Sequence, residues 1–83
     1  MGKLEINRVY RHYKGNYYFV KETAISSETL EECVVYQALY GEYKTFVRPL
    51  EMFLERIDKD NEDNITKQEY RFELVDLEKV KLW

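Results

Sequence analysis

Six polar and aromatic side chains in the first fifty residues could together bind a small polar ligand. Arginine offers a planar set of N–H donors for a carboxylate or phosphate, histidine can donate or accept a hydrogen bond, and tyrosine rings can stack on a flat group. Alternate residues of a strand lie on one face, so Tyr10 shares a face with His12, as Tyr36 does with Tyr40. The candidate ligand-binding residues are His12, Glu28, Thr29, Tyr36, Tyr40 and Arg48.

The same residues also have a purely structural interpretation. Glu28 could pair with Arg48, and Thr29 could hold its loop in place, because buried polar groups in a small domain need partners. Structural ion pairs also produce such clusters. We hypothesise a binding or interaction module in which Arg48 anchors an anionic or carbonyl group of a small ligand or a protein partner, and in which His12 and Glu28 fix its orientation.

Nucleophilic catalysis would have to use Cys33 and His12, the single cysteine and the single histidine. A cysteine nucleophile needs a stabilised thiolate, an adjacent base and an oxyanion site. Glu32 beside Cys33 would disfavour the thiolate. The sequence has no phosphate-binding glycine loop, nucleophile elbow or zinc-ligand spacing. We therefore expect no enzymatic activity, no cofactor and no metal ligands.

A twelve-residue acidic segment, residues 58–69, resembles the calcium-binding loop of an EF-hand. Carboxylates stand at the first, third, fifth and twelfth loop positions, where such a loop takes its ligands; they are Asp58, Asp60, Glu62 and Glu69. However, Asp63 replaces the glycine that the sixth position needs, and residues 70–75 alternate like a strand where a helix should follow. A solvated acidic loop is the favoured interpretation, with calcium binding as an alternative.

The distribution of charge argues against a nucleic-acid partner. The formal net charge is −3, with seven basic and six acidic residues in 1–50, and six basic and ten acidic residues in 51–83. Tyr17, Tyr18 and Phe19 could stack on bases, but the acidic second half would repel phosphates. A nucleic-acid-binding small barrel is kept as an alternative function.

Length and apolar content predict one small domain. A chain of 83 residues fits a single domain, which we assign to residues 1–83. No apolar stretch approaches the roughly 20 residues that span a bilayer, and the first residues have no apolar signal core. The single cysteine excludes an intramolecular disulfide and fits a reducing compartment. We expect a cytoplasmic protein without a membrane segment; its oligomeric state is left open.

β-prone runs separated by short turns predict the strands. Residues 9–13 and 17–20 flank the turn-forming residues 14–16, which is typical of a β-hairpin. Residues 34–40 are apolar on both faces, as in a central strand, and residues 45–48 follow a Gly-containing turn. The alternation in residues 70–75 predicts a last strand.

One short helical turn is expected near residues 49–54. Pro49 ends the preceding strand because it has no N–H to donate, and it suits the first position of a helix. Helical spacing then continues in Leu50, Phe53, Leu54 and Ile57. Thr29 and Glu32 fit a capping box, but the β-branched residues that follow favour a loop or a single turn. The pattern as a whole predicts a mainly β fold: a small SH3-like barrel of about five strands with one helical turn.

Four segments resemble a known bacterial family. They are Tyr10-Arg11-His12-Tyr13-Lys14-Gly15, Ser27-Glu28-Thr29, Val34-Val35-Tyr36 with Leu39-Tyr40-Gly41, and Val47-Arg48-Pro49-Leu50-Glu51-Met52-Phe53. Their order and spacing are similar to those of the domain of unknown function 1653. The resemblance covers roughly half of the chain, and it implies a small SH3-like barrel of uncharacterised function. Ser26 stands where the family usually has histidine, and Phe46 where it usually has tryptophan.

Overall fold

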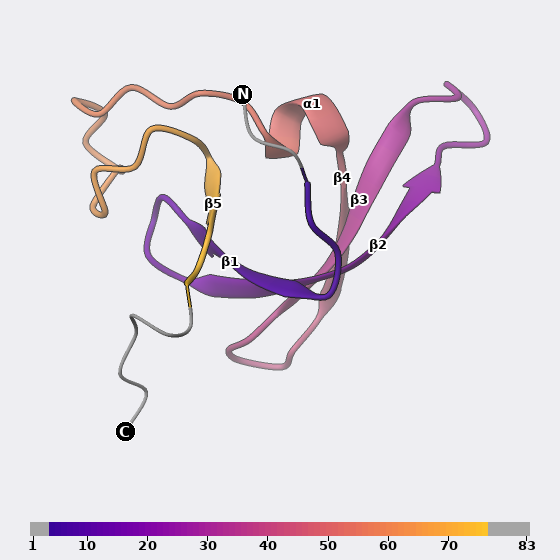
Figure 1. The fold of residues 1–83 in the computed structure, drawn as a ribbon, viewed down its shortest axis with the longest axis horizontal. Coiled ribbons are helices and arrows are strands. Elements are labelled where there is room, and N and C mark those ends of the chain that lie inside the picture. The colour runs from indigo at the N-terminus through magenta and orange to yellow at the C-terminus, as the bar shows by residue number, and fades with distance from the viewer. Residues whose placement is uncertain (1–3, 77–83) are drawn as a thin grey trace.

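The computed structural model describes residues 4–76, which form a single antiparallel sheet with one short helix (Figure 1). The elements are β1 (Arg8–His12), β2 (Tyr17–Ile25), β3 (Glu32–Ala38), β4 (Thr45–Pro49), α1 (Leu50–Phe53) and β5 (Phe72–Leu74). The strand order is β4-β3-β2-β1-β5. The predicted mainly β class, with about five strands and one helical turn, is confirmed.

The β1–β2 hairpin turns at residues 13–16, as the turn-forming residues predicted. Val9 pairs with Phe19, and Arg11 pairs with Tyr17. Gly15 has a φ of +110°, which is a conformation that side-chain-bearing residues rarely adopt. A Cβ atom on Gly15 would also lie 3.2 Å from Cδ1 of Ile65, so the acidic segment rests against this turn.

β3 lies inside the sheet, between β2 and β4, as its two apolar faces predicted. The β2–β3 register shifts between Val20 and Glu22, and such a bulge bends and twists a strand. Beyond the bulge, β2 extends to Ile25 and carries an exposed loop of residues 26–31. The sequence match to a capping box at Thr29 and Glu32 does not start a helix, and the loop that the sequence favours forms instead: Glu32 is already in β3, and the Thr29 hydroxyl accepts from the backbone N–H of Glu31 (3.3 Å).

The single helical turn follows directly from the end of β4. Pro49 is both the last residue of β4 and the N-cap of α1. The prediction made Pro49 the first helical residue, whereas the helix begins one residue later, at Leu50. Phe53, at the end of α1, is fully buried and anchors the turn in the core. The chain then crosses through residues 54–71, a connection with one isolated bridge between Arg56 and Tyr70.

β5 returns to the beginning of the chain and pairs with β1. Tyr10 lies opposite Leu74, and His12 lies opposite Phe72. β5 is shorter than the predicted strand over residues 70–75, because Glu73 folds back to accept hydrogen bonds from the backbone N–H groups of Glu69 (2.9 Å) and Tyr70 (3.1 Å).

Aromatic rings fill most of the core. The buried cluster consists of Tyr10, Val20, Val34, Tyr36, Phe53 and Phe72. Phe53 and Phe72 stack in parallel with ring centroids 4.0 Å apart, while Tyr10 and Tyr36 meet Phe53 edge to face. Such pairs contribute about 0.5–1.5 kcal/mol beyond the area they bury, so few residues suffice for a core in a chain of this length.

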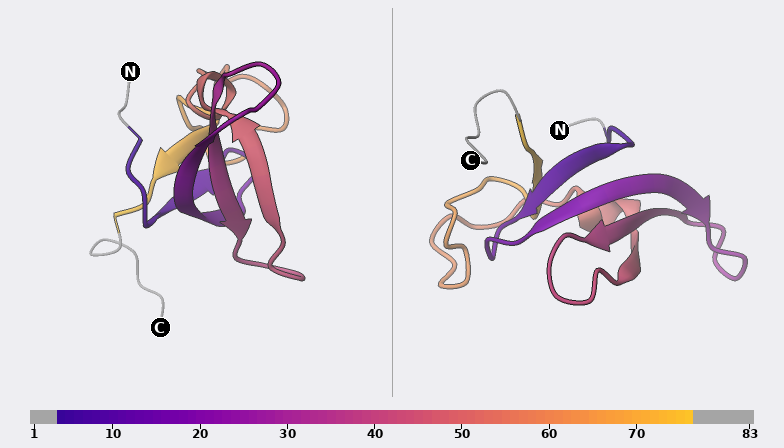
Figure 2. Two further views of the ribbon diagram at one scale, coloured as in Figure 1. Left: turned by 90° about the vertical axis from the view of Figure 1, so that its right-hand side faces the viewer. Right: turned by 90° about the horizontal axis from the view of Figure 1, so that it is seen from below.

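The sheet curls strongly, as Figure 2 shows. Its two edge strands are β4 and β5, yet the guanidinium carbon of Arg48 in β4 lies 5.8 Å from the ring centroid of Phe72 in β5. Among the described residues, hydrogen bonds define an open five-stranded sheet, so the finer SH3-like barrel assignment stays a prediction. Within residues 4–76, no helix is long and apolar enough to cross a membrane.

Candidate functional site

The ring of Phe72 is the point where three of the six predicted site residues, His12, Tyr36 and Arg48, meet. Its centroid lies 4.8 Å from that of His12, 5.5 Å from that of Tyr18 and 5.4 Å from that of Tyr36. These residues come from β1, β2, β3 and β5, which the curl of the sheet brings around one centre. We call the surface over this centre the arginine face; it consists of His12, Tyr18, Tyr36, Tyr40 and Arg48.

Arg48 is half-buried, and hydrogen bonds within the described chain engage only its Nε. This Nε donates to the hydroxyl oxygen of the buried Tyr36 (3.0 Å), and the guanidinium also lies near the Phe72 ring. In residues 4–76, no carboxylate pairs with Arg48, and its Nη1 and Nη2 atoms have no hydrogen-bond acceptor. Arg48 is therefore fixed in position at one end and has N–H donors to spare.

His12 is held as a neutral ring. Burial is the main reason that its pKa falls from 6.5 to about 4, and the positive charges of Arg48, Arg71 and Lys14 lower it further. The backbone N–H of Lys14 donates to its Nδ1 (3.1 Å), so the proton of the neutral ring is on Nε2. No acceptor for this Nε2–H exists in the described part of the chain, which makes His12 a second spare donor.

Tyr18 and Tyr40 form the outer part of the face. Their hydroxyl oxygens are 2.6 Å apart, and their rings meet edge to face at 5.6 Å. Burial raises the pKa of Tyr18, and the hydrogen bond to Tyr40 raises it further, so Tyr18 stays uncharged at neutral pH. Tyr40 is 41% exposed, whereas Tyr36 is buried. The tyrosines thus run from the core to the solvent.

Glu28 and Thr29 lie elsewhere. Both are in the loop between β2 and β3, which Figure 1 places at the far end of the hairpin from β5. The alternative pairing of Glu28 with Arg48 is not formed. Thr29 does hold its loop, because its N–H donates to Oγ of Ser26 (3.3 Å) and its hydroxyl accepts from Glu31. The structure therefore groups four of the six predicted residues.

The acidic segment 58–69 is organised around an amide side chain. Asn64 is 1% exposed, and its Nδ2 donates to the carbonyl oxygens of Asp58 (3.2 Å) and Gln68 (2.9 Å). Its Oδ1 accepts from the backbone N–H of Gln68 (3.0 Å). Asp58 and Asn61 use their side-chain oxygens to accept backbone N–H groups within the loop. No group of three potential metal ligands occurs in the described residues.

The residues considered for catalysis lie apart in the sheet, and two of the three considered for base stacking have contacts within the domain. Cys33 is buried beside Ala24 and Pro49, whereas His12 lies opposite Phe72, so the cysteine and the histidine are on different parts of the sheet. Of the aromatics that could stack on bases, Tyr18 packs against Phe72, and Tyr17 is covered by the guanidinium of Arg11 (5.1 Å).

Sequence reasoning missed the two residues that organise the arginine face. The sequence pattern indicates Phe72 only as part of a strand, and Tyr18 only as a stacking side chain. The hairpin register carries a signal for Tyr18, because it pairs with Tyr10 and so shares a face with Tyr10 and His12. No local signal identifies Phe72, because its neighbours in the core are distant in sequence.

The fold and the arginine face define a small curled β domain whose aromatic core is bordered by one half-buried arginine, Arg48. DUF1653, a family of proteins of unknown function, matches residues 8–74. The crystal structure of a DUF1653 protein from Bordetella bronchiseptica is 33% identical, with a TM-score of 0.70, over 86% of this chain and 87% of that one. No curated protein matches the chain. The chain belongs to the DUF1653 family.

Proposed function

We propose that this chain is a small binding module, of the SH3-like barrel type, that recognises an anionic or carbonyl oxygen group on its arginine face. The observation that carries the proposal is the half-buried Arg48, whose Nη1 and Nη2 atoms have no acceptor in residues 4–76. Partial burial of a cation without a carboxylate is costly. A bound carboxylate or phosphate would offset that cost through paired N–H···O bonds.

The neighbouring groups suit the same ligand. The Nε2–H of His12 and the hydroxyl pair of Tyr18 and Tyr40 can donate to further oxygens. Phe46 is 41% exposed and lies beside Tyr36, with ring centroids 5.8 Å apart, so it adds apolar area at the rim. Glu28 and Thr29 take no part in this site, because their loop lies away from the arginine face.

Binding of simple anions tests the proposal. Inorganic phosphate and acetate, titrated separately into ¹⁵N-labelled protein, should shift the Nε–H resonance of Arg48 and the backbone amides around it. Arg48→Ala should abolish these shifts, and Arg48→Lys should weaken binding about tenfold because lysine lacks the planar fork. The small-molecule fraction of a cell extract, applied in the same way, would then supply the natural ligand for purification.

Arg11→Ala is the matched control. Arg11 also has no carboxylate partner in the described chain, but it lies at the β1–β2 turn, where its Nε donates to the carbonyl of Gly15 (3.2 Å). This variant should bind as the wild type does. Arg48→Ala leaves the Tyr36 hydroxyl without its donor, which costs about 1 kcal/mol of stability. Equal losses of anion binding in Arg48→Ala and Arg11→Ala would show that anions are attracted by net charge and not by a site at Arg48. Unfolding of both Arg48 variants would show that Arg48 is structural.

A further inference from the structure

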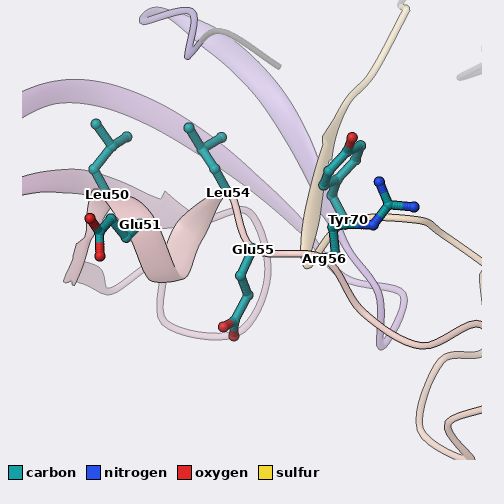
Figure 3. Close-up of a pocket in the computed structure, with 6 residues that line it drawn as sticks. All are labelled: Leu50, Glu51, Leu54, Glu55, Arg56 and Tyr70. Atoms are coloured by element: carbon teal, nitrogen blue, oxygen red, sulfur yellow. The ribbon is translucent and has the colours of Figure 1, made fainter. Parts of the chain in front are cut away.

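A groove runs beside α1, and its lining includes none of the arginine-face residues. One pocket of about 430 Å³ is mainly apolar and is lined by Leu50, Glu51, Leu54, Glu55, Arg56 and Tyr70. Figure 3 shows the side chains of Leu50 and Leu54 extending on the same side of the chain, with the ring of Tyr70 pointing in a similar direction. The three side chains are half-buried, so apolar surface remains open to solvent.

A second, smaller hollow continues this groove. It has a volume of about 240 Å³ and is lined by Glu31, Glu32, Leu50 and Glu51. Because Leu50 and Glu51 line both hollows, the two form one surface, which we call the α1 groove. Its floor is Leu50, Leu54 and Tyr70, and its rim includes Glu31, Glu32 and Glu51.

The rim of the α1 groove carries uncompensated negative charge. Glu55 is paired with Arg71, and Arg56 is paired with Glu69 (2.8 Å), so these charges are balanced. The other three rim carboxylates, those of Glu31, Glu32 and Glu51, are exposed and have no ion-pair partner among residues 4–76.

We infer that the α1 groove binds a partner's peptide segment in which lysine or arginine alternates with large apolar side chains. An apolar floor with an acidic rim is complementary to such a segment: its apolar side chains would fill the two hollows, and its cations would pair with the glutamates. A phosphate-bearing ligand would be repelled by the rim. A bare metal ion would find no converging set of oxygen ligands in the described chain.

A pair of synthetic peptides tests this inference independently of anion binding. The probe is an end-blocked hexapeptide of alternating lysine and leucine, and its comparison has glutamate in place of lysine. The lysine peptide should shift the amide resonances of Leu50, Glu51 and Leu54. Replacing its leucines with serine should abolish the shifts, and the glutamate peptide should not bind.

Two charge-reversed variants locate the site. Glu51→Lys, at the centre of the α1 groove, should weaken binding of the lysine peptide about tenfold, because it replaces an attraction with a repulsion. Glu62→Lys makes the same change of net charge in the exposed acidic segment and should leave binding unchanged. Equal weakening by both variants, or equal binding of the two peptides, would overturn the inference.

Discussion

At the scale of single residues, hydroxyl and imidazole groups mark the boundary between the aromatic core and the solvent. The hydroxyl of Tyr10 accepts from the backbone N–H of Glu5 (2.9 Å), and that of Tyr36 accepts from Arg48. Burial raises the pKa of Tyr10, so this group is uncharged at neutral pH. Each partner lies towards the edge of the core, where a polar atom can be satisfied without breaking the packing of the rings.

His12 should titrate far below the usual range for histidine. It is the single histidine of the chain, so its ring resonances can be assigned without ambiguity, and a titration by NMR should give a pKa of about 4. The unfolded state takes up the proton near pH 6.5 and the folded state only near pH 4. Stability is therefore complete above pH 6.5 and is lost as the pH falls towards 4, by on the order of 1 kcal/mol after allowance for solvent screening.

His12→Asn provides the control for this pH dependence. The Oδ1 of asparagine can accept from the N–H of Lys14 as Nδ1 of His12 does, but it does not titrate. The difference in stability between the wild type and this variant, followed by urea unfolding from pH 7 to pH 4, should shrink by the same amount. If this difference in stability stayed constant over that pH range, His12 would have the same pKa in the folded and the unfolded state.

The types of the site residues could be chosen from sequence, but their partners could not. Strand alternation placed His12 on the same face of β1 as Tyr10, because the side-chain period of a strand is local. Charge alone offers Glu28 as a partner for Arg48, whereas the structure gives it the Tyr36 hydroxyl. Contacts between residues of different strands depend on the curl of the sheet, which no local pattern encodes.

At the scale of elements, the β1–β2 turn and the acidic segment support each other. Gly15 leaves room for the side chain of Ile65, and Nε2 of Gln68 donates to the carbonyl of Arg11 (3.0 Å). The long connection between α1 and β5 is thereby held against the hairpin. Its acidic residues face outward, while its amide residues Asn64 and Gln68 are buried. The sequence showed the charges of this segment but not its buried amides.

Gly15→Ala should destabilise the domain by about 1–3 kcal/mol. The φ of +110° is unfavourable for alanine, and the new Cβ would lie 3.2 Å from Ile65. Urea unfolding measures the loss. Gly41→Asn is the comparison, because Gly41 has a φ of +61°, which asparagine tolerates, and open space around it. A loss in Gly15→Ala no larger than in Gly41→Asn would contradict the close contact with Ile65.

Asn64→Ala should cost about 2–4 kcal/mol. It removes the amide side chain that donates to the carbonyl of Gln68 and accepts from its N–H, so these two buried backbone groups lose their partner. Asn61→Ala is the matched control. The side chain of Asn61 is exposed, and its Oδ1 accepts one backbone N–H, from Asp63 (2.8 Å). This variant should therefore lose no more than about 0.5 kcal/mol of stability. Similar midpoints of thermal unfolding in the two variants would show that the buried amide does not hold the loop.

At the scale of the whole molecule, the elements formed by neighbouring residues were predictable from the sequence, but the pairing of β5 with β1 was not. The hairpin of β1 and β2, the interior place of β3 and the helical turn after Pro49 all follow from patterns of a few residues. Pairing of β5 with β1 joins segments some sixty residues apart, and the sequence carries no register signal over that distance. The family resemblance did not supply this pairing either, because its four segments end at Phe53; the DUF1653 family match, by contrast, extends to residue 74.

The strand order divides the strand pairs into those between consecutive strands and one between strands far apart in the sequence. β1 to β4 pair in succession, so each strand needs only its predecessor, and loop closure at that range costs little entropy. β5 pairs with the opposite end of this meander and brings Phe72 against Phe53 and Tyr36. We expect the arginine face to be assembled late in folding, because its central ring arrives with the last strand.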